Sequence, residues 1–233
     1  MSTDQMTTKN INNNGPKNCT INSNYFVLPG LKHYWGFNGN LNDSIGNAHL
    51  YGGINKTFAL NRFNSSYSAL NLYGGYLDMP AGVYFNSNFA LLTWVYPRKY
   101  ANWARIFECG NGTNNNNIIF AYSKAFGGFP NFQIYNPIQY DLLSTLKLTL
   151  NTWQHLAFVL NNTKAYIFTN GNLTVQNLAF VSPANVVRIN CFIGKSNWNT
   201  DELADANFDE MKIFDRALSQ QEIINEMNND FCV

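Results

Sequence analysis

The feature that most constrains this chain is a long succession of short apolar segments, separated by breaks rich in glycine and asparagine. Breaks such as FNGN, YGG, CGNGTNNNN and FGGFPN favour turns. At Asn170–Gly171 both residues tolerate positive φ, which predicts a two-residue hairpin. We expect strands over 31–37, 48–54, 68–79, 89–96, 104–109, 117–123, 131–135, 145–150, 153–160, 164–169, 173–180, 190–195 and 208–214. Strands at this spacing predict an all-β sandwich or jelly roll.

The composition fits such a fold and argues against several kinds of partner. Aromatic residues make up 15% of the chain and charged residues only 12%, with a formal net charge of +1. Strands favour aromatic residues, and a nearly neutral chain gives no electrostatic basis for binding nucleic acid or an anionic membrane. No apolar run reaches the roughly 18 residues that a membrane span needs, and the first residues lack a signal-peptide pattern.

The chain divides into an arm and one domain. Residues 1–24 are polar, Asn-rich and without periodicity, which predicts a flexible N-terminal arm. Residues 25–233 are expected to form a single domain. One short C-terminal helix is predicted within it, because Ser219 and Glu222 have the spacing of a capping box and Leu218 and Ile223 that of a hydrophobic staple.

Four cysteines and seven sequons point outside the cell. The cysteines allow three pairings, and a bridge between Cys19 and Cys232 is plausible because the termini of a domain are often neighbours. Cys109 and Cys191 lie within apolar strands, where we expect buried free thiols slightly ahead of a second bridge. Seven Asn-x-Ser/Thr sequons are a mild excess over the roughly four expected by chance. They stand at Asn18, Asn42, Asn55, Asn64, Asn111, Asn161 and Asn172.

Six motifs occur in a fixed order over residues 30–223. They are GLKHYWGFNGNLNDSIGN, ALNLYGGYLDMP, FALLTWVYP, NTWQHLAFVLNNTKAYIFTNG, CFIGKSNW and ANFDEMKIFDRALSQQEI. Together they resemble the laminin G-like, concanavalin A-like jelly-roll domain in its pentraxin-related form. The resemblance implies a sandwich of two antiparallel sheets. In that fold Trp35 and Phe37, which share one side of the first strand, are expected in the core.

The resemblance also raises the question of catalysis. Laminarinase-type hydrolases of similar fold carry Glu-x-Asp-x-(x)-Glu on one strand, where alternation aims the carboxylates at one sugar. This chain has no such motif, and its nearest acidic run, DELAD over 201–205, has the character of a loop. Strict alternation would place Asp209 and Glu210 on opposite faces. The three histidines lack patterned partners, so no catalytic residue is expected and the chain is predicted not to be an enzyme.

Asp209 is the candidate metal ligand. It shares parity with the apolar Met211 and Ile213, so its charge requires a partner. The resemblance implies a structural Ca²⁺ held by Asp209, by Asn40 and Asp43 of the NGNLND loop, and by the backbone at Gly74–Gly75. The alternative is that Asp209 accepts hydrogen bonds from backbone N–H groups of that loop, without metal.

Two loops carry the candidate ligand-binding residues. Aromatic faces can stack on sugar rings while amides and charged groups bond the hydroxyls. The loops offer Tyr100, Trp103, Arg105, Asn197, Trp198 and Asn199, with Tyr135 and Tyr140 as weaker candidates. The alternative is that the two tryptophans merely cover an edge of the sandwich.

These observations predict a non-catalytic module that binds a glycan or glycoprotein outside the cell. The main alternative is a protein–protein adhesion or assembly module on the same fold. A polysaccharide hydrolase or lyase is less favoured, because the carboxylate motif is missing. Fold alone cannot separate the first two, because function depends on the residues that a fold carries.

Overall fold

The computed structural model describes residues 28–229. The predicted arm over 1–24 and the predicted Cys19–Cys232 bridge therefore lie outside the described residues. The strands are β1 (Leu31–Trp35), β2 (Tyr51–Ala59), β3 (Ala69–Met79), β4 (Phe89–Pro97), β5 (Ala104–Gly110), β6 (Ile118–Ser123), β7 (Asn131–Tyr135), β8 (Gln139–Leu143), β9 (Gln154–Asn161), β10 (Lys164–Thr169), β11 (Asn172–Asn177), β12 (Asn190–Ile193) and β13 (Ala204–Phe214), followed by helix α1 (Gln220–Asn228).

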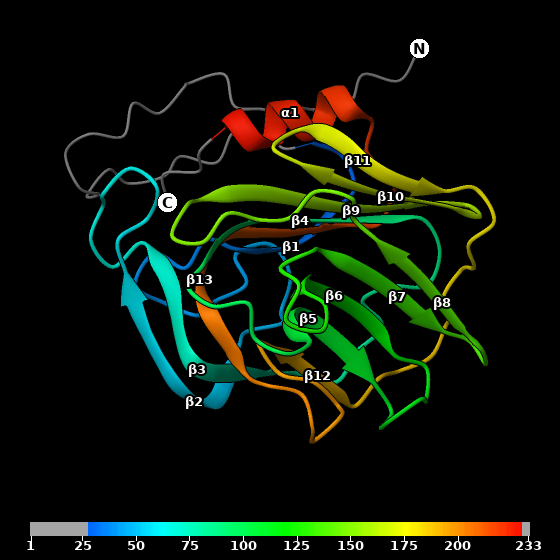
Figure 1. Cartoon of the computed structure of the whole chain (residues 1–233), viewed down its shortest axis with the longest axis horizontal. Coiled ribbons are helices and arrows are strands. Elements are labelled where there is room, and N and C mark those ends of the chain that lie inside the picture. The colour runs from blue at the N-terminus through cyan, green and yellow to red at the C-terminus, as the bar shows by residue number, and fades with distance from the viewer. Residues whose placement is uncertain (1–27, 230–233) are drawn as a thin grey trace, which may run out of the picture.

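The strands form a sandwich whose two layers are joined by β3 (Figure 1). One continuous antiparallel path runs β11-β10-β9-β4-β13-β3-β12-β5-β6-β7-β8, with β1 added to β13 and β2 to β3. The first half of β3, Leu70–Gly75, pairs with β13, and its second half, Leu77–Met79, pairs with β12. The predicted jelly-roll sandwich is confirmed, with the detail that its two sheets share this strand.

Most predicted strands are found, and the Asn170–Gly171 hairpin is confirmed by the positive φ of both residues. The strand predicted over 145–150 is wrong. The strand in this part of the chain is β8, which ends before residue 145 and pairs with β7 through a tight turn that puts Tyr135 opposite Gln139. Pro137 lies in that turn and is the sequence signal for the break between β7 and β8 that the predicted strand pattern did not include.

The core between the layers is aromatic. Phe120 on β6 lies at its centre, with ring centroids 5.1 Å from Phe132 and 5.2 Å from Phe158. The predicted core residues Trp35 and Phe37 are 0% and 1% exposed. Such rings bury large apolar areas and dominate the energy of packing.

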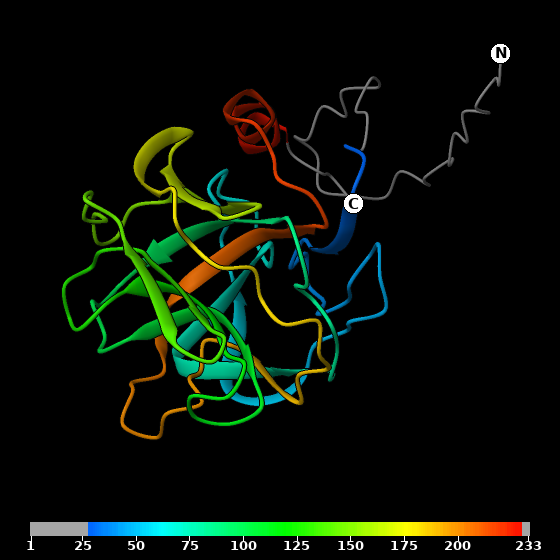
Figure 2. The same ribbon diagram turned by 90° about the vertical axis from the view of Figure 1, so that its right-hand side faces the viewer.

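A second apolar cluster lies under α1, on the outer face of the layer that contains β13. Figure 2 shows the helix on the side of that layer away from β5–β8. The capping box and its staple residues are confirmed: the Ser219 hydroxyl and the Glu222 carboxylate each bond the other's backbone amide, while Leu218 and Ile223 are buried. Lys212 of β13 also forms a buried ion pair of 2.9 Å with Glu226 of the helix.

Cys109 and Cys191 form a disulfide, so the expectation of free thiols is wrong. They stand directly opposite each other on the neighbouring strands β5 and β12, with Cα atoms 4.0 Å apart. Because 82 residues separate the two cysteines in sequence, only the sheet topology reveals this pairing.

Replacing both Cys109 and Cys191 by alanine should lower the free energy of unfolding by about 2 to 4 kcal/mol, because the bridge restricts the unfolded chain. Urea denaturation measures the change, and reduced wild-type protein should show a similar loss. Thiol titration of denatured, unreduced wild type supplies the check. Reaction at all four cysteines would show that the bridge is absent.

Candidate ligand-binding site

Polar side chains gather on the outer face of the layer formed by β5–β8. Alternation along β7 sends Phe132 and Ile134 into the core, so Asn131, Gln133 and Tyr135 face outward. Outward residues of β5, β6 and β8 lie beside them. Several of these polar side chains are nevertheless buried: Arg105, Glu108, Ser123, Asn131 and Gln133.

Arg105 is the centre of this face. A register shift lies between Arg105 and Phe107 opposite β6, and it places Arg105 on the same face as Glu108 although the two are three residues apart. The guanidinium donates to Glu108 Oε2 at 2.5 Å, Ser196 Oγ at 2.9 Å and Asp201 Oδ2 at 2.8 Å. Arg105 is only 2% exposed, so its donors are used inside the protein rather than offered to a ligand.

The side chains of Trp103 and Trp198 both lie close to this guanidinium. Arg105 Cζ lies 5.7 Å from the Trp103 ring centroid and 5.9 Å from that of Trp198, within the range of cation–π attraction. Trp103 has a φ of 52°, which is unusual for a bulky residue, and its carbonyl accepts a hydrogen bond from Arg105 Nη1. The Trp198 ring also packs at 5.6 Å on Tyr135.

Glu108 supports the second loop. Its Oε2 is bonded to Arg105, while its Oε1 accepts from the Asn197 backbone N–H at 3.1 Å and from Asn197 Nδ2 at 2.9 Å. Asn117 Nδ2 donates to the same oxygen at 3.1 Å. The buried carboxylate thus holds the loop that carries Trp198 against β5.

An ion pair between Lys124 and Asp141 lies next to Trp103, on the side away from Trp198 and Tyr135 in the order of contacts. Lys124 Nζ lies 5.2 Å from the Trp103 centroid and 2.5 Å from Asp141 Oδ2. Asn131 and Gln133 both donate to Asp141 Oδ1, at 2.7 and 2.8 Å. Burial alone would raise the pKa of Asp141, but the bonds from Lys124, Asn131 and Gln133 hold it below its ordinary value. We call this row of six residues the aromatic strip: Tyr135, Trp198, Arg105, Trp103, Lys124 and Asp141.

The structure brings four of the six predicted ligand residues together: Trp103, Arg105, Asn197 and Trp198. Tyr100 stands apart, because its hydroxyl bonds the Leu148 carbonyl and Lys147 Nζ lies over its ring. Asn199 is exposed in the Trp198 loop. Of the weaker candidates, Tyr135 joins the strip, whereas Tyr140 packs inward on Phe180. Glu108, Lys124 and Asp141 were not among the predicted ligand residues. The polar–apolar alternation of residues 131–135 was the signal that could have located this face.

The predicted metal ligands do not form one group. Asn40 is exposed, and Gly75 lies in β3 opposite Ala204. The Asp43 carboxylate is surrounded by donors of its own loop and of β1. It accepts from His33 Nδ1 at 2.6 Å and from the backbone N–H groups of Tyr34, Ile45, Gly46 and Ala48. The backbone-amide role considered for Asp209 is therefore filled by Asp43.

Asp209 instead lies on the outer face of β13. A bulge between Asp209 and Lys212 inserts one extra residue, Glu210, whose φ is 53°. The predicted parity is therefore wrong: Asp209 and Glu210 share the face opposite the core residue Met211. Asp209 Oδ2 is paired with Arg62 Nη1 at 3.1 Å, and Glu210 Oε1 accepts from the Tyr34 hydroxyl at 2.7 Å.

Burial raises the pKa of both carboxyls, and Asp209 rises further because Glu210 repels its charge. Within residues 28–229, no group of three or more His, Cys, Asp or Glu side chains is placed to hold a metal ion. The four predicted ligands thus do not fit Ca²⁺, because Asp43 is saturated by amides and Arg62 supplies the cation beside Asp209. These residues argue against Ca²⁺ at the predicted site, and the melting experiment below tests the calcium prediction itself.

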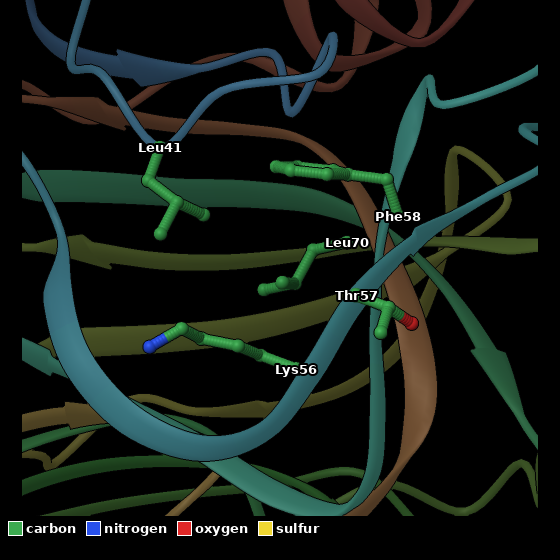
Figure 3. A pocket seen from close by; sticks show the side chains of 5 residues that line it. All are labelled: Leu41, Lys56, Thr57, Phe58 and Leu70. Atoms are coloured by element: carbon green, nitrogen blue, oxygen red, sulfur yellow. The ribbon is translucent and has the colours of Figure 1, made fainter.

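A pocket within residues 28–229 lies away from the aromatic strip, between the arch of β2 and the loop that carries Leu41 (Figure 3). Its volume is about 190 Å³, and its walls are mainly Leu41, Phe58 and Leu70, with Lys56 and Thr57 at the side. Ligand sites for small molecules are commonly about 300 Å³ or larger. This space is too small and too apolar to receive a sugar chain.

Asp43→Asn should lower the free energy of unfolding by about 2 to 3 kcal/mol at pH 7. Burial opposes ionisation of Asp43, but the bond from His33 and the backbone amides lower its pKa to about 2. Because this pKa is below the ordinary value of 3.8, the ionised carboxylate stabilises the folded protein above pH 3.8. That stabilisation is lost as the pH falls towards 2. The gap between variant and wild type should therefore close at acid pH. Asp215→Asn, which removes an exposed ion pair, is the control. A gap that is constant with pH would contradict the assignment.

Excess calcium and chelator should give the same melting temperature, because Arg62 already neutralises the carboxylate that a Ca²⁺ ion would need. A bound ion must raise the melting temperature by mass action. A calcium-dependent rise that Asp209→Asn removes would overturn this expectation and place the ion at Asp209.

Comparison with known proteins agrees with the fold. Residues 71–224, more than half of the chain, match the sequence profile of the concanavalin A-like lectin/glucanases superfamily. No curated protein sequence matches the chain. No helix within residues 28–229 is long and apolar enough to cross a membrane.

Several solved structures share the architecture. Domain 4 of AbnA, a GH43 extracellular arabinanase from Geobacillus stearothermophilus solved in complex with arabinotriose, aligns with a TM-score of 0.72 at 20% identity, over 84% of this chain and 97% of that one. The binding domain of Paraclostridial Mosquitocidal Protein 1 aligns with a TM-score of 0.63 at 17% identity, over 85% and 52% of the two chains. The receptor binding domain of botulinum neurotoxin D aligns at 0.61 and 15% identity, over 84% and 52%. This chain spans about half the length of either toxin domain.

At these identities the likenesses show a shared fold alone. The family match covers most of the strands described above, from β3 to α1, including those that carry the aromatic strip. On this evidence the chain belongs to the concanavalin A-like lectin/glucanases superfamily.

Proposed function

We propose that this protein is a non-catalytic carbohydrate-binding module. The observation that carries the proposal is the pair of half-buried tryptophans, Trp103 and Trp198, whose rings both lie within about 6 Å of the buried Arg105 guanidinium. Rings fixed in this way can stack on the C–H faces of sugars without losing side-chain freedom on binding. The arabinotriose-bound domain of similar fold supports this choice of ligand class.

The carboxylates near the strip are placed for structure rather than for acid–base chemistry. Glu108 and Asp201 are both ion-paired with Arg105, and the lowered pKa of Asp141 makes it a poor proton donor at neutral pH. Asp209 and Glu210 do have raised pKa values, but they are 2% and 7% exposed on the other layer. A glycosidic bond would not reach them there.

A place outside the cell fits the covalent chemistry of the chain. Stable disulfides such as Cys109–Cys191 belong to oxidising compartments. Most sequons within residues 28–229 are on exposed asparagines, as glycosylation requires. These are Asn42, Asn55, Asn64, Asn161 and Asn172.

A protein-binding module on the same fold is the second candidate. It is favoured by the toxin domains of similar fold, which are named as binding domains. The two candidates differ in what the strip contacts, so one experiment separates them.

Wild-type protein should bind at least one polysaccharide on a broad panel or glycan array, beginning with arabinotriose and arabinan. Trp103→Ala and Trp198→Ala should each weaken that binding about tenfold or more, because each removes a stacking face. Tyr67→Ala is the matched control, since this tyrosine is 70% exposed and lies in the loop before β3.

The possible results distinguish the proposals. Absence of binding across the panel would contradict the carbohydrate proposal and favour the protein-binding one. Equal losses in all three variants would show that the tryptophans are not the site. Release of sugar from any polysaccharide on the panel would overturn the non-catalytic assignment.

A further inference from the structure

The aromatic strip and the side chains that brace it carry more carboxylates than cations. The Arg105 guanidinium is paired with both Glu108 and Asp201, and Lys124 is paired with Asp141. Three carboxylates therefore offset two cations. Nearby Lys99 is likewise paired with Glu202 at 2.7 Å. An anionic glycan at the strip would meet cations, Arg105 and Lys124, that are already paired with carboxylates, and like charges across an interface cost affinity.

The Lys124–Asp141 pair still has hydrogen-bonding capacity. An ionised carboxylate has about four lone-pair sites, and the protein fills three of them through Lys124, Asn131 and Gln133. An ammonium has three donors, of which Asp141 takes one. The two side chains are 23% and 33% exposed, so the remaining donors and acceptor can reach a ligand. A sugar diol needs both kinds of partner.

The pair is also held rigidly beside a stacking face. Asn131 is fully buried, and its Nδ2 donates to both Asp141 Oδ1 and the Leu142 carbonyl. Reversing the amide would place its oxygen against a carboxylate and a carbonyl, so the orientation is fixed even though Asn131 Oδ1 has no partner. Lys124 in turn lies 5.2 Å from the Trp103 centroid. A sugar stacked on Trp103 would thus present its hydroxyls to the ion pair.

We propose that the strip selects neutral glycans over anionic ones, and that Asp141 determines this selection by neutralising Lys124 and accepting a sugar hydroxyl. This inference rests on the carbohydrate-binding function proposed above. It adds a substrate class, sugars without carboxylate or sulfate groups, and a specificity-determining residue outside the tryptophan loops.

The test compares neutral probes (arabinotriose, arabinan, galactan and xylan) with anionic ones (polygalacturonate and heparin), using calorimetry on the full chain. Wild type should bind at least one neutral probe and neither anionic one. Asp141→Asn should weaken neutral binding about tenfold, because a charge-assisted hydrogen bond is lost. The same variant should gain measurable binding to an anionic probe, because Lys124 is left without its carboxylate.

Two further variants separate recognition from simple disruption of the fold. Lys124→Met should weaken neutral binding without any gain for anionic probes, since it removes the cation itself. Asp215→Asn breaks a lysine–aspartate pair of the same kind, Lys32–Asp215 at 2.9 Å, which joins β1 to the start of the turn before α1 and should change neither affinity. Each variant is checked for an unchanged circular dichroism spectrum.

Salt supplies an independent readout. Binding of wild type to a neutral probe should not change between low and high salt, whereas the new binding of Asp141→Asn to an anionic probe should weaken as salt screens it. A merely structural role for Asp141 would produce neither the gain nor its salt dependence.

The outcomes keep the two proposals apart. If wild type binds neutral glycans through Trp103 and Trp198 but Asp141→Asn leaves both affinities unchanged, the selection proposal is wrong and the binding function stands. Tight wild-type binding to polygalacturonate or heparin would also overturn it. Failure of wild type to bind any probe would reject the binding function and the selection with it.

Discussion

The antiparallel ladder along β3 fixes the relation between the two layers of this sandwich. One half of the strand pairs with β13 and the other half with β12, so hydrogen bonds continue from the helix-covered layer into the layer that carries the aromatic strip. The disulfide then links β12 covalently to β5, the next strand in the sheet order. Every loop at the strip is therefore attached to strands whose register is set by backbone bonds.

The buried Arg105–Glu108 pair organises the candidate site on that scaffold. Burying two charges costs several kcal/mol unless their hydrogen bonds are satisfied, and here both side chains are bonded on several sides. Arg105 bonds the backbone of the Trp103 loop, and Glu108 bonds the backbone of the Trp198 loop, so the pair holds both loops in place. Fixed aromatic rings lose little entropy on binding, which is how preorganisation raises affinity.

Periodicity and motif order were enough to predict the sandwich, its helix cap and the two tryptophan loops. They failed where an extra residue enters a strand. The register shift after Arg105 places Glu108 on the same face of β5 as Arg105. The bulge at Glu210 places Asp209 on the outer face of β13, away from the core. Strict alternation gives the opposite answer at both places, because a bulge changes parity without any mark in composition. The Cys109–Cys191 bridge was missed for a related reason, since strand order is not local information.

The shared strand has a consequence for how such a module would work. Sandwich layers that meet only through side chains can slide or hinge, whereas layers joined through β3 can separate only by breaking a continuous backbone ladder. Occupancy of the strip would then leave the far side of the molecule, where α1 lies, unchanged in shape. If the proposed binding function holds, such a rigid domain would act as a passive anchor, because ligand at the strip would cause no change of shape at α1.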